Sequence, residues 1–139
     1  MIGVAAHYDE LAQAVKCEFQ FLAELGYSPQ PPVRRPMYWA RDYVSDKVGF
    51  RIWADMRGEL TADMWLTASA AEHFEIVRFA VWQPFGINAP IMFGGDTRIA
   101  TAARLLANYV RTNAADALAG EPAAFERARG WQHPQSQLP

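Results

Sequence analysis

The sequence predicts an α+β fold: an N-terminal helix, an antiparallel meander of three or four strands, and C-terminal helices packed on one face of that sheet. Near both ends of the chain, apolar residues recur at three- and four-residue steps, as they do in amphipathic helices. Between these ends, apolar and polar residues alternate in twos and are interrupted by turn residues, which is typical of strands. A chain of 139 residues can bury its own core, so we expect a single domain over 1–139.

The first helix is predicted over 8–25. Its apolar positions share one face, namely Tyr8, Leu11, Val15, Phe19, Leu22 and Leu25. Gly26 follows at the position where a helix commonly ends. The next segment, 28–36, carries four prolines and is predicted to be a connecting loop.

The meander is predicted over 38–66, with turns at 45–47 and 57–59. Directly paired residues must share a face of the sheet, so the hydrophobic pattern predicts the register. We expect Val44 to pair with Val48, and Met56 to pair with Leu60. The predicted core face is then Phe50, Ile52, Ala54, Met56, Leu60, Ala62, Met64 and Leu66.

The segment 70–82 is open to two interpretations. Ser69 and Glu72 have the spacing of a capping box, which favours a short helix. The stretch FEIVRFAVW that follows could instead form a fourth strand. Beyond it, a long helix is predicted over 97–119, and a last helix is predicted over 122–129 because Pro122 suits a first helical position.

The other face of the meander carries tryptophan together with charge. The expected register pairs Trp39 with Trp53, Arg41 with Arg51 and Trp53 with Asp63. The candidate partner-binding residues are Trp39, Arg41, Tyr43, Arg51, Trp53, Asp63 and Trp65. Two interpretations compete: the long C-terminal helix covers this face, or both long helices cover the apolar face and leave this one open. Because buried charges are costly, we expect the open arrangement, and Trp with Arg is the composition of binding hot spots.

Composition and motifs exclude several function classes. The net charge of −2 and the pI of about 5.9 argue against nucleic acid as a partner, and no window is apolar enough to cross a membrane. The single cysteine, Cys17, is expected to be a buried residue of a cytoplasmic protein. The three histidines, His7, His73 and His133, lack metal-ligand spacing. We therefore expect no metal, no cofactor and no catalytic residue, although an enzyme whose catalytic groups assemble across distance stays open.

Two segments carry a resemblance to a known group of proteins. The meander YVSDKVGFRIWADMRGELTADMWL holds an aspartate, Asp55, near the end of a strand, and the helix LLANYVRTNAADALAGEPAAFERARG contains a Gly-x-Pro-x-x-Phe-like stretch at 120–125. Their order resembles that of small uncharacterised bacterial α/β proteins, some of which are labelled immunity proteins of polymorphic toxin systems. The tryptophans of the meander depart from that pattern, and no catalytic residue comes with the resemblance.

Two functional hypotheses follow. In the first, the chain is a cytoplasmic protein-binding module, an immunity or inhibitor protein that neutralises a cognate toxin or enzyme by stoichiometric binding; a homodimer through the same face is a variant of this hypothesis. In the second, it is a small-ligand-binding domain or enzyme with a pocket at the apolar loop 84–95. The side chains expected to line that pocket are Trp82, Phe85, Met92 and Phe93.

Overall fold

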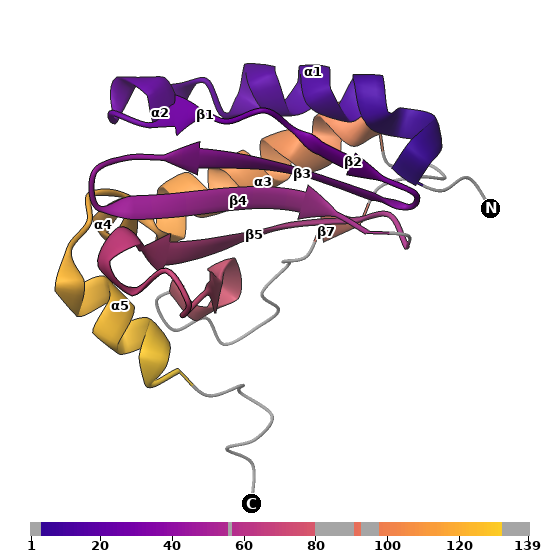
Figure 1. The fold of residues 1–139 in the computed structure, drawn as a ribbon. Helices are drawn as coiled ribbons and strands as arrows, with labels where there is room; N and C mark the ends of the chain where they lie inside the picture. The colour runs from indigo at the N-terminus through magenta and orange to yellow at the C-terminus, as the bar shows by residue number, and fades with distance from the viewer. Residues whose placement is uncertain (1–3, 56, 80–90, 93–97, 132–139) are drawn as a thin grey trace, which may run out of the picture.

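The chain folds as an α+β protein, as the sequence predicts: an N-terminal helix, an antiparallel sheet and C-terminal helices (Figure 1). The computed structural model describes residues 4–55, 57–79, 91–92 and 98–131. The helical elements are η1 (Val4–His7), α1 (Tyr8–Glu18), α2 (Phe21–Glu24), η2 (Thr67–Ser69), η3 (Ile76–Phe79), α3 (Ile99–Asn113), α4 (Ala115–Leu118) and α5 (Pro122–Arg129). The strands are β1 (Ser28–Pro29), β2 (Val33–Arg35), β3 (Tyr38–Val44), β4 (Val48–Ala54), β5 (Glu59–Leu66), β6 (Phe74–Glu75) and β7 (Ile91–Met92).

The sheet is built on the long meander β3-β4-β5. Its strand order is β1-β3-β4-β5-β6, and the short strands β2 and β7 pair with β3 and β5 respectively. Every described pairing is antiparallel. Both edges of the meander are therefore extended by short strands rather than left bare.

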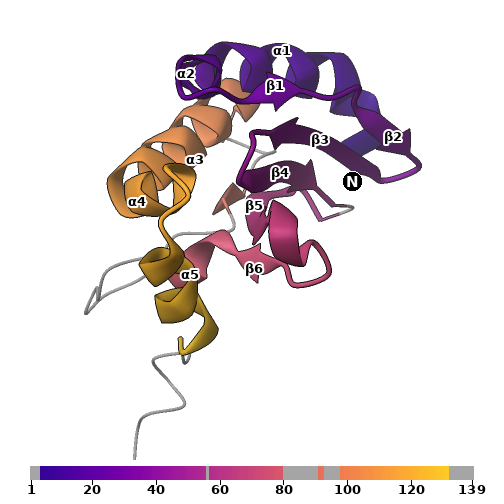
Figure 2. The same cartoon turned by 60° about the vertical axis from the view of Figure 1, so that its left-hand side comes forward.

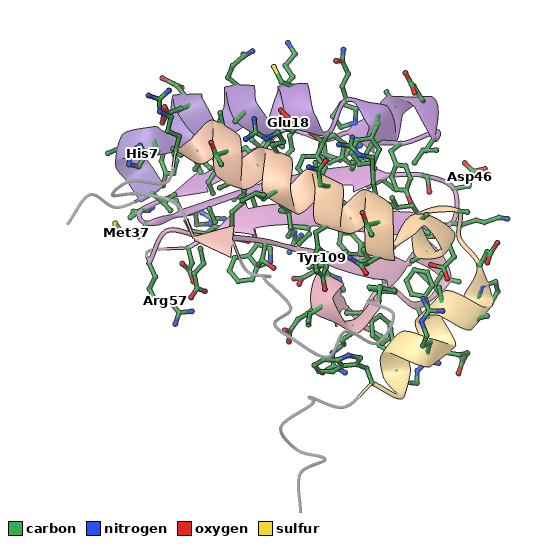
Figure 3. All side chains as sticks on the ribbon, turned by 180° about the vertical axis from the view of Figure 1, so that it is seen from behind. His7, Glu18, Met37, Asp46, Arg57 and Tyr109 are labelled. Atoms are coloured by element: carbon green, nitrogen blue, oxygen red, sulfur yellow. The ribbon has the colours of Figure 1, made fainter. Side chains whose placement is uncertain are left out.

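The two long helices, α1 and α3, lie on the same side of the sheet (Figures 1 and 2). Seen from behind, α3 runs across the sheet beside α1, and Asp46 and Arg57 mark opposite ends of the meander (Figure 3). The Phe19 ring, just after α1, lies 5.9 Å from the Phe50 ring of β4. The core therefore fills the space between these helices and the face of the sheet that carries Phe50, Ile52 and Met64, all fully buried.

Neither of the long helices, α1 and α3, crosses the other face of the meander (Figures 1 and 2). Its side chains are mostly half-buried, in contrast to the fully buried residues that alternate with them along β4 and β5. We call this surface the open face. Its polar and aromatic side chains are those of Tyr38, Asp42, Arg51, Trp53, Thr61, Asp63, Trp65 and Glu75.

The register between β3 and β4 differs by one residue from the predicted one. Trp39 pairs with Ala54, and Arg41 pairs with Ile52. The cause is the turn: Ser45 and Val48 are joined by a backbone hydrogen bond of 2.9 Å, so the loop is two residues long rather than three. A shift of one residue moves every side chain of a strand to the opposite face.

The register between β4 and β5 differs by two residues, which leaves the faces unchanged. Ala54 pairs with Leu60, and Gly58 adopts a left-handed backbone with φ of 81° in the turn between them. The predicted core face is confirmed at the buried positions, which are Phe50, Ile52, Ala54, Leu60, Ala62 and Met64. Leu66 is half-buried and packs against the core, whereas Met56 lies outside the described residues.

Several predicted elements are interrupted or shorter. The helix predicted over 8–25 breaks between α1 and α2, and the one predicted over 97–119 breaks at Ala114, between α3 and α4; residue 97 lies outside the described residues. The predicted loop 28–36 contributes the short edge strands β1 and β2. Pro29 is tolerated in β1 because an edge strand can leave one N–H side unpaired. Of 70–82, the described part forms no α-helix but the short fourth strand β6 and the turn η3; residues 80–82 lie outside the described residues.

Two side chains predicted to be buried are exposed. Cys17 lies on the outer side of α1, where the Gln13 amide donates a hydrogen bond to its sulfur. Leu25 is 53% exposed because it follows α2 in the turn to Gly26, whose φ is 90°. The helical stripe therefore ends one turn earlier than its spacing indicates.

Replacement of Trp39 by Ala should remove a large, fully buried side chain. We expect Trp39→Ala to lower the free energy of unfolding by roughly 3–5 kcal/mol, measured by urea denaturation. Trp53→Ala is the matched control, because Trp53 is half-buried on the open face and should lose clearly less. Equal losses in the two variants would contradict the observed register.

Candidate binding surface

Four charged side chains form a row across the open face, one from each of four neighbouring strands. The register pairs them in succession, so that each lies beside the next. We call this set the charge row: Asp42, Arg51, Asp63 and Glu75. It holds three carboxylates and a single guanidinium, so the centre of the open face has an excess of negative charge.

Arg51 is held by two of its neighbours, Asp42 and Trp65. Its Nε and Nη2 atoms donate to the two carboxylate oxygens of Asp42 at 2.7 and 3.0 Å, and these bonds raise the pKa of the Arg51 guanidinium. The same guanidinium lies 5.6 Å from the centre of the Trp65 ring. A bidentate pair of this kind holds both side chains in a defined geometry.

Trp65 is fixed from two sides and is only 8% exposed. Its ring lies directly over Gly49, the residue opposite it in the sheet, where an added Cβ would come within 2.0 Å of the indole. His73, from the connection between β5 and β6, stacks on the ring at 4.3 Å and an interplanar angle of 6°. Trp65 thus serves to hold Arg51 and His73 and offers little free surface to a partner.

Trp53, on the other side of the charge row, borders a cavity of about 430 Å³. The Tyr38 ring lies 6.3 Å from it on the side away from β5. The cavity walls are formed by Trp53, Arg57, Glu59, Thr61, Asp63, Glu75 and Val77. Its volume falls in the range of small-ligand sites, and it combines an aromatic wall with several polar groups.

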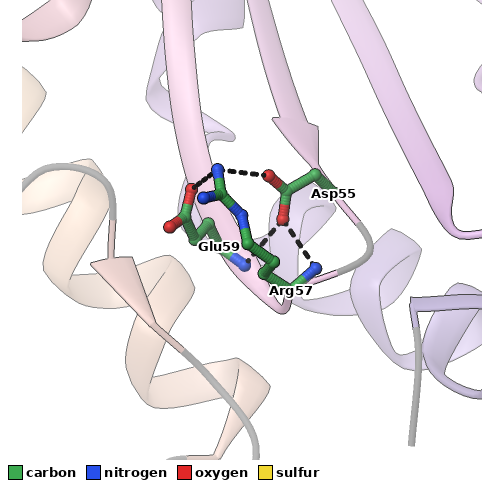
Figure 4. Close-up of polar contacts among 3 residues, drawn as sticks. All are labelled: Asp55, Arg57 and Glu59. Carbon is green, nitrogen blue, oxygen red and sulfur yellow. Dashed lines mark hydrogen bonds and ion pairs between the residues drawn. The ribbon is translucent and has the colours of Figure 1, made fainter.

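The rim of the cavity is organised by the β4–β5 turn (Figure 4). The Arg57 guanidinium lies between two carboxylates, donating to Asp55 at 3.2 Å and to Glu59 at 2.9 Å. The Asp55 carboxylate also accepts the backbone N–H of Arg57 at 2.9 Å. The positive charge at this rim is therefore already neutralised within the turn.

The surroundings of Asp63 change the acidity of its carboxyl group. Burial raises the pKa of its carboxyl above the ordinary 3.8; the Trp53 indole opposes the rise, and the neighbouring Glu75 adds to it. His73 and Arg51 lower this pKa by smaller amounts. Arg51 contributes little because its hydrogen bonds are directed to Asp42 rather than to Asp63.

The structure brings together four of the seven residues predicted from the sequence as a binding surface. Arg51, Trp53, Asp63 and Trp65 share the open face. The remaining three, Trp39, Arg41 and Tyr43, were predicted wrongly and lie on the helix-covered face of β3, because the shorter turn moves the register by one residue. Trp39 and Tyr43 are buried, and the Arg41 guanidinium lies 5.9 Å over the Tyr43 ring.

Three charged or aromatic members of the open face, Tyr38, Asp42 and Glu75, were missed by the sequence reasoning. Ala40 pairs with Trp53 and Asp42 pairs with Arg51, the places predicted for Trp39 and Arg41. A two-residue turn at Asp46 and Lys47 would therefore have identified Asp42 and, on the same face of β3, Tyr38. Glu75 belongs to the stretch that reads as a fourth strand, and its pairing with Asp63 follows only from the tertiary structure.

The remaining sequence predictions concern pockets, metals and membranes. The loop pocket at 84–95 lies almost wholly outside the described residues, which include only the backbone of Ile91 and Met92. Within the described ranges, no group of three or more His, Cys, Asp or Glu side chains is arranged to hold a metal ion. None of the described helices is long and apolar enough to cross a membrane.

Comparison of the chain with protein-family models, with curated proteins and with solved structures gives no match. The resemblance to immunity proteins therefore stays a hypothesis, and function has to be argued from the geometry of the open face.

Replacement of Gly49 by Ala should displace the Trp65 ring, because the added methyl group would occupy the position of the indole. We expect Gly49→Ala to lower the free energy of unfolding by roughly 1–3 kcal/mol and to abolish the ring-current shift of His73 in NMR spectra. Gly130→Ala is the control, since its Cβ would make only an ordinary contact at 3.7 Å. A stable Gly49→Ala variant with an unchanged His73 signal would contradict this packing.

Replacement of Asp63 by Asn should stabilise the protein at neutral pH. Because the pKa of Asp63 is raised in the folded state, its contribution to stability is fully present below pH 3.8 and is lost as the pH rises through the raised value. Asn imitates the protonated acid, so we expect a gain of roughly 0.2–1 kcal/mol at pH 7 that disappears below pH 4, measured by thermal and urea denaturation across this range. Glu24→Gln, an exposed change in α2, should show no such gain. Destabilisation by Asp63→Asn at pH 7 would mean that the carboxylate has a structural partner.

Proposed function

We propose that this protein is a binding module that acts by stoichiometric association with another protein through the open face. The observation that carries the proposal is the charge row, which lies between Trp53 and Trp65 on a face that neither α1 nor α3 covers. Trp, Tyr and Arg gathered on one surface are the side chains enriched at protein-binding hot spots.

The fixed geometry of the face supports this proposal. Arg51 is held by Asp42 and by the Trp65 ring, and Trp65 is held by Gly49 and His73. Side chains already held in one conformation lose little entropy on binding, which favours affinity. Trp53 and Tyr38, both half-buried, are the aromatic side chains that remain available to a partner.

The charge of the face favours a basic partner protein. Three carboxylates and one guanidinium repel phosphate, so the surface is unsuited to nucleic acid. A complementary partner surface would carry Lys or Arg, and its association rate would fall with ionic strength. The immunity-protein resemblance supplies a concrete partner class, a cognate toxin or enzyme whose active surface would be occluded. A reducing, cytoplasmic setting is part of the proposal and agrees with the free, exposed thiol of Cys17.

A second candidate function is small-ligand binding, and the cavity beside Trp53 is the observation that favours it. The cavity differs in place from the loop pocket that the sequence suggested.

Affinity capture from a native cell lysate tests the binding module, with wild type, Trp53→Ala and Leu105→Ala used side by side. Leu105 is a matched apolar control, because it is 46% exposed on α3, which packs on the opposite side of the sheet. We expect one stoichiometric protein to be retained by wild type and by Leu105→Ala. Trp53→Ala should weaken its binding by roughly 2 kcal/mol or more, about 30-fold.

Two outcomes would contradict the proposal. If Trp53→Ala retains the partner protein as well as wild type does, the open face does not take part in the interaction. If nothing is retained and light scattering shows a mass that rises with concentration in wild type but not in Trp53→Ala, the face is instead a contact between two copies of this chain.

A further inference from the structure

The cavity beside Trp53 has a charge imbalance that the described residues do not correct. Asp63 and Glu75 are paired directly across the ladder between β5 and β6, and both line the cavity. Like charges placed opposite each other in an antiparallel pair disfavour folding. No described side chain forms an ion pair with either of them, since Arg51 bonds to Asp42 and Arg57 bonds to Asp55 and Glu59.

The Trp65 side of the same sheet shows that an indole ring and a carboxylate together can hold a guanidinium group. On the Trp65 side of the charge row, a guanidinium lies 5.6 Å over an indole ring and makes two hydrogen bonds to one carboxylate. On the Trp53 side, an indole and two carboxylates surround a cavity of about 430 Å³. Both sides combine an indole with carboxylate acceptors, but the cation of the first side bonds to its own carboxylate, whereas Arg57 in the cavity wall bonds to Asp55 and Glu59 and leaves Asp63 and Glu75 without an ion pair among the described residues.

We infer that the cavity is a binding site for an organic cation of the guanidinium or alkylammonium type, which lies against Trp53 and is neutralised by Asp63 and Glu75. A planar guanidinium fits best, because it stacks on an aromatic face and offers several N–H groups to neighbouring carboxylates at once. The Thr61 hydroxyl and the Val77 side chain complete the wall and suit the polar head and the alkyl stem of such a ligand. The Glu59 carboxylate at the rim is already shared with Arg57 and directs the ligand inward toward Asp63.

This inference does not require the proposed function. The cation could be the side chain of an arginine or lysine on a bound protein, or it could be a free organic amine. Both sources share the chemistry that the cavity recognises. The experiment therefore measures binding to the chain alone and uses one probe for each source.

The test is an NMR titration that follows the indole N–H signals, with the Trp53 signal assigned from Trp53→Phe. The first probe is N-acetyl-L-arginine N-methylamide, which imitates an arginine within a protein. Its neutral counterpart is the corresponding capped citrulline, which has nearly the same shape without the charge. The second cationic probe is agmatine, a free amine that carries the same guanidinium.

We expect the capped arginine to shift the Trp53 signal in a saturable way and to leave the Trp65 signal nearly unchanged. The capped citrulline should bind at least about tenfold more weakly, which corresponds to about 1.4 kcal/mol. Glu75→Gln and Asp63→Asn should each weaken the capped arginine by a similar factor, whereas Glu24→Gln, which changes the net charge equally, should not. Agmatine that binds much more tightly than the capped residue would assign the site to a free amine, and comparable affinities would assign it to a protein side chain.

The inference would be overturned by any of three results: no saturable shift of Trp53 with either cation, equal binding of arginine and citrulline, or unchanged affinity in both carboxylate variants. Loss of folding is not an alternative explanation, because the thermal stability of each variant is measured in the same samples and Asp63→Asn is expected to be the more stable protein. If neither cation binds in the titration but partner capture still depends on Trp53, the cation site is rejected and the proposed binding module is retained.

Discussion

The closure of the β3–β4 turn determines which side chains of this protein meet the core and which meet solvent. Two hydrogen bonds between Ser45 and Val48 close the turn. The Ser45 backbone N–H donates to the Val48 carbonyl, and the Ser45 hydroxyl accepts the Val48 N–H at 3.1 Å. With a turn of two residues, Trp39 and Tyr43 lie on the same side as Phe50 and Ile52. A turn longer by one residue would place Asp42 against the helices and Trp39 in solvent, at a large cost in desolvation and lost packing.

The closure of the β3–β4 turn also determines how the charged residues of β3 are distributed between the two faces of the sheet. On the helix-covered face of β3, Arg41 is the only charged residue, and its guanidinium lies over the Tyr43 ring at a partly exposed position. The acids and the remaining arginine of the meander centre fall on the open face, where they form the charge row. The cost of burying several charges is thus avoided, but the charges on the open face include Asp42 and Glu75 and exclude Arg41.

The two tryptophans of the open face have different roles because their surroundings differ. Trp65 lies on Gly49 and under His73, so it is part of the framework that positions Arg51. Trp53 lies between the Tyr38 ring and a cavity, and is the aromatic group that an incoming partner or ligand would contact. The two sides of the charge row also differ in charge balance, because Asp42 is paired with Arg51 whereas Asp63 and Glu75 form no ion pair with a described side chain.

The sequence by itself determined the class of fold, the extent of the meander and the range of the last helix, because these follow from local periodicity and from Gly and Pro at element ends. It also determined that Arg51, Trp53, Asp63 and Trp65 share a face, since the error in the second register was an even number of residues. Only the tertiary structure decided the face of Trp39, Arg41 and Tyr43, because a difference of one residue in turn length is invisible to periodicity and yet inverts a strand. The pairing of Asp63 with Glu75 and the cavity beside them were likewise decided by the tertiary structure, since they depend on where a two-residue strand docks after a turn that sequence patterns do not specify.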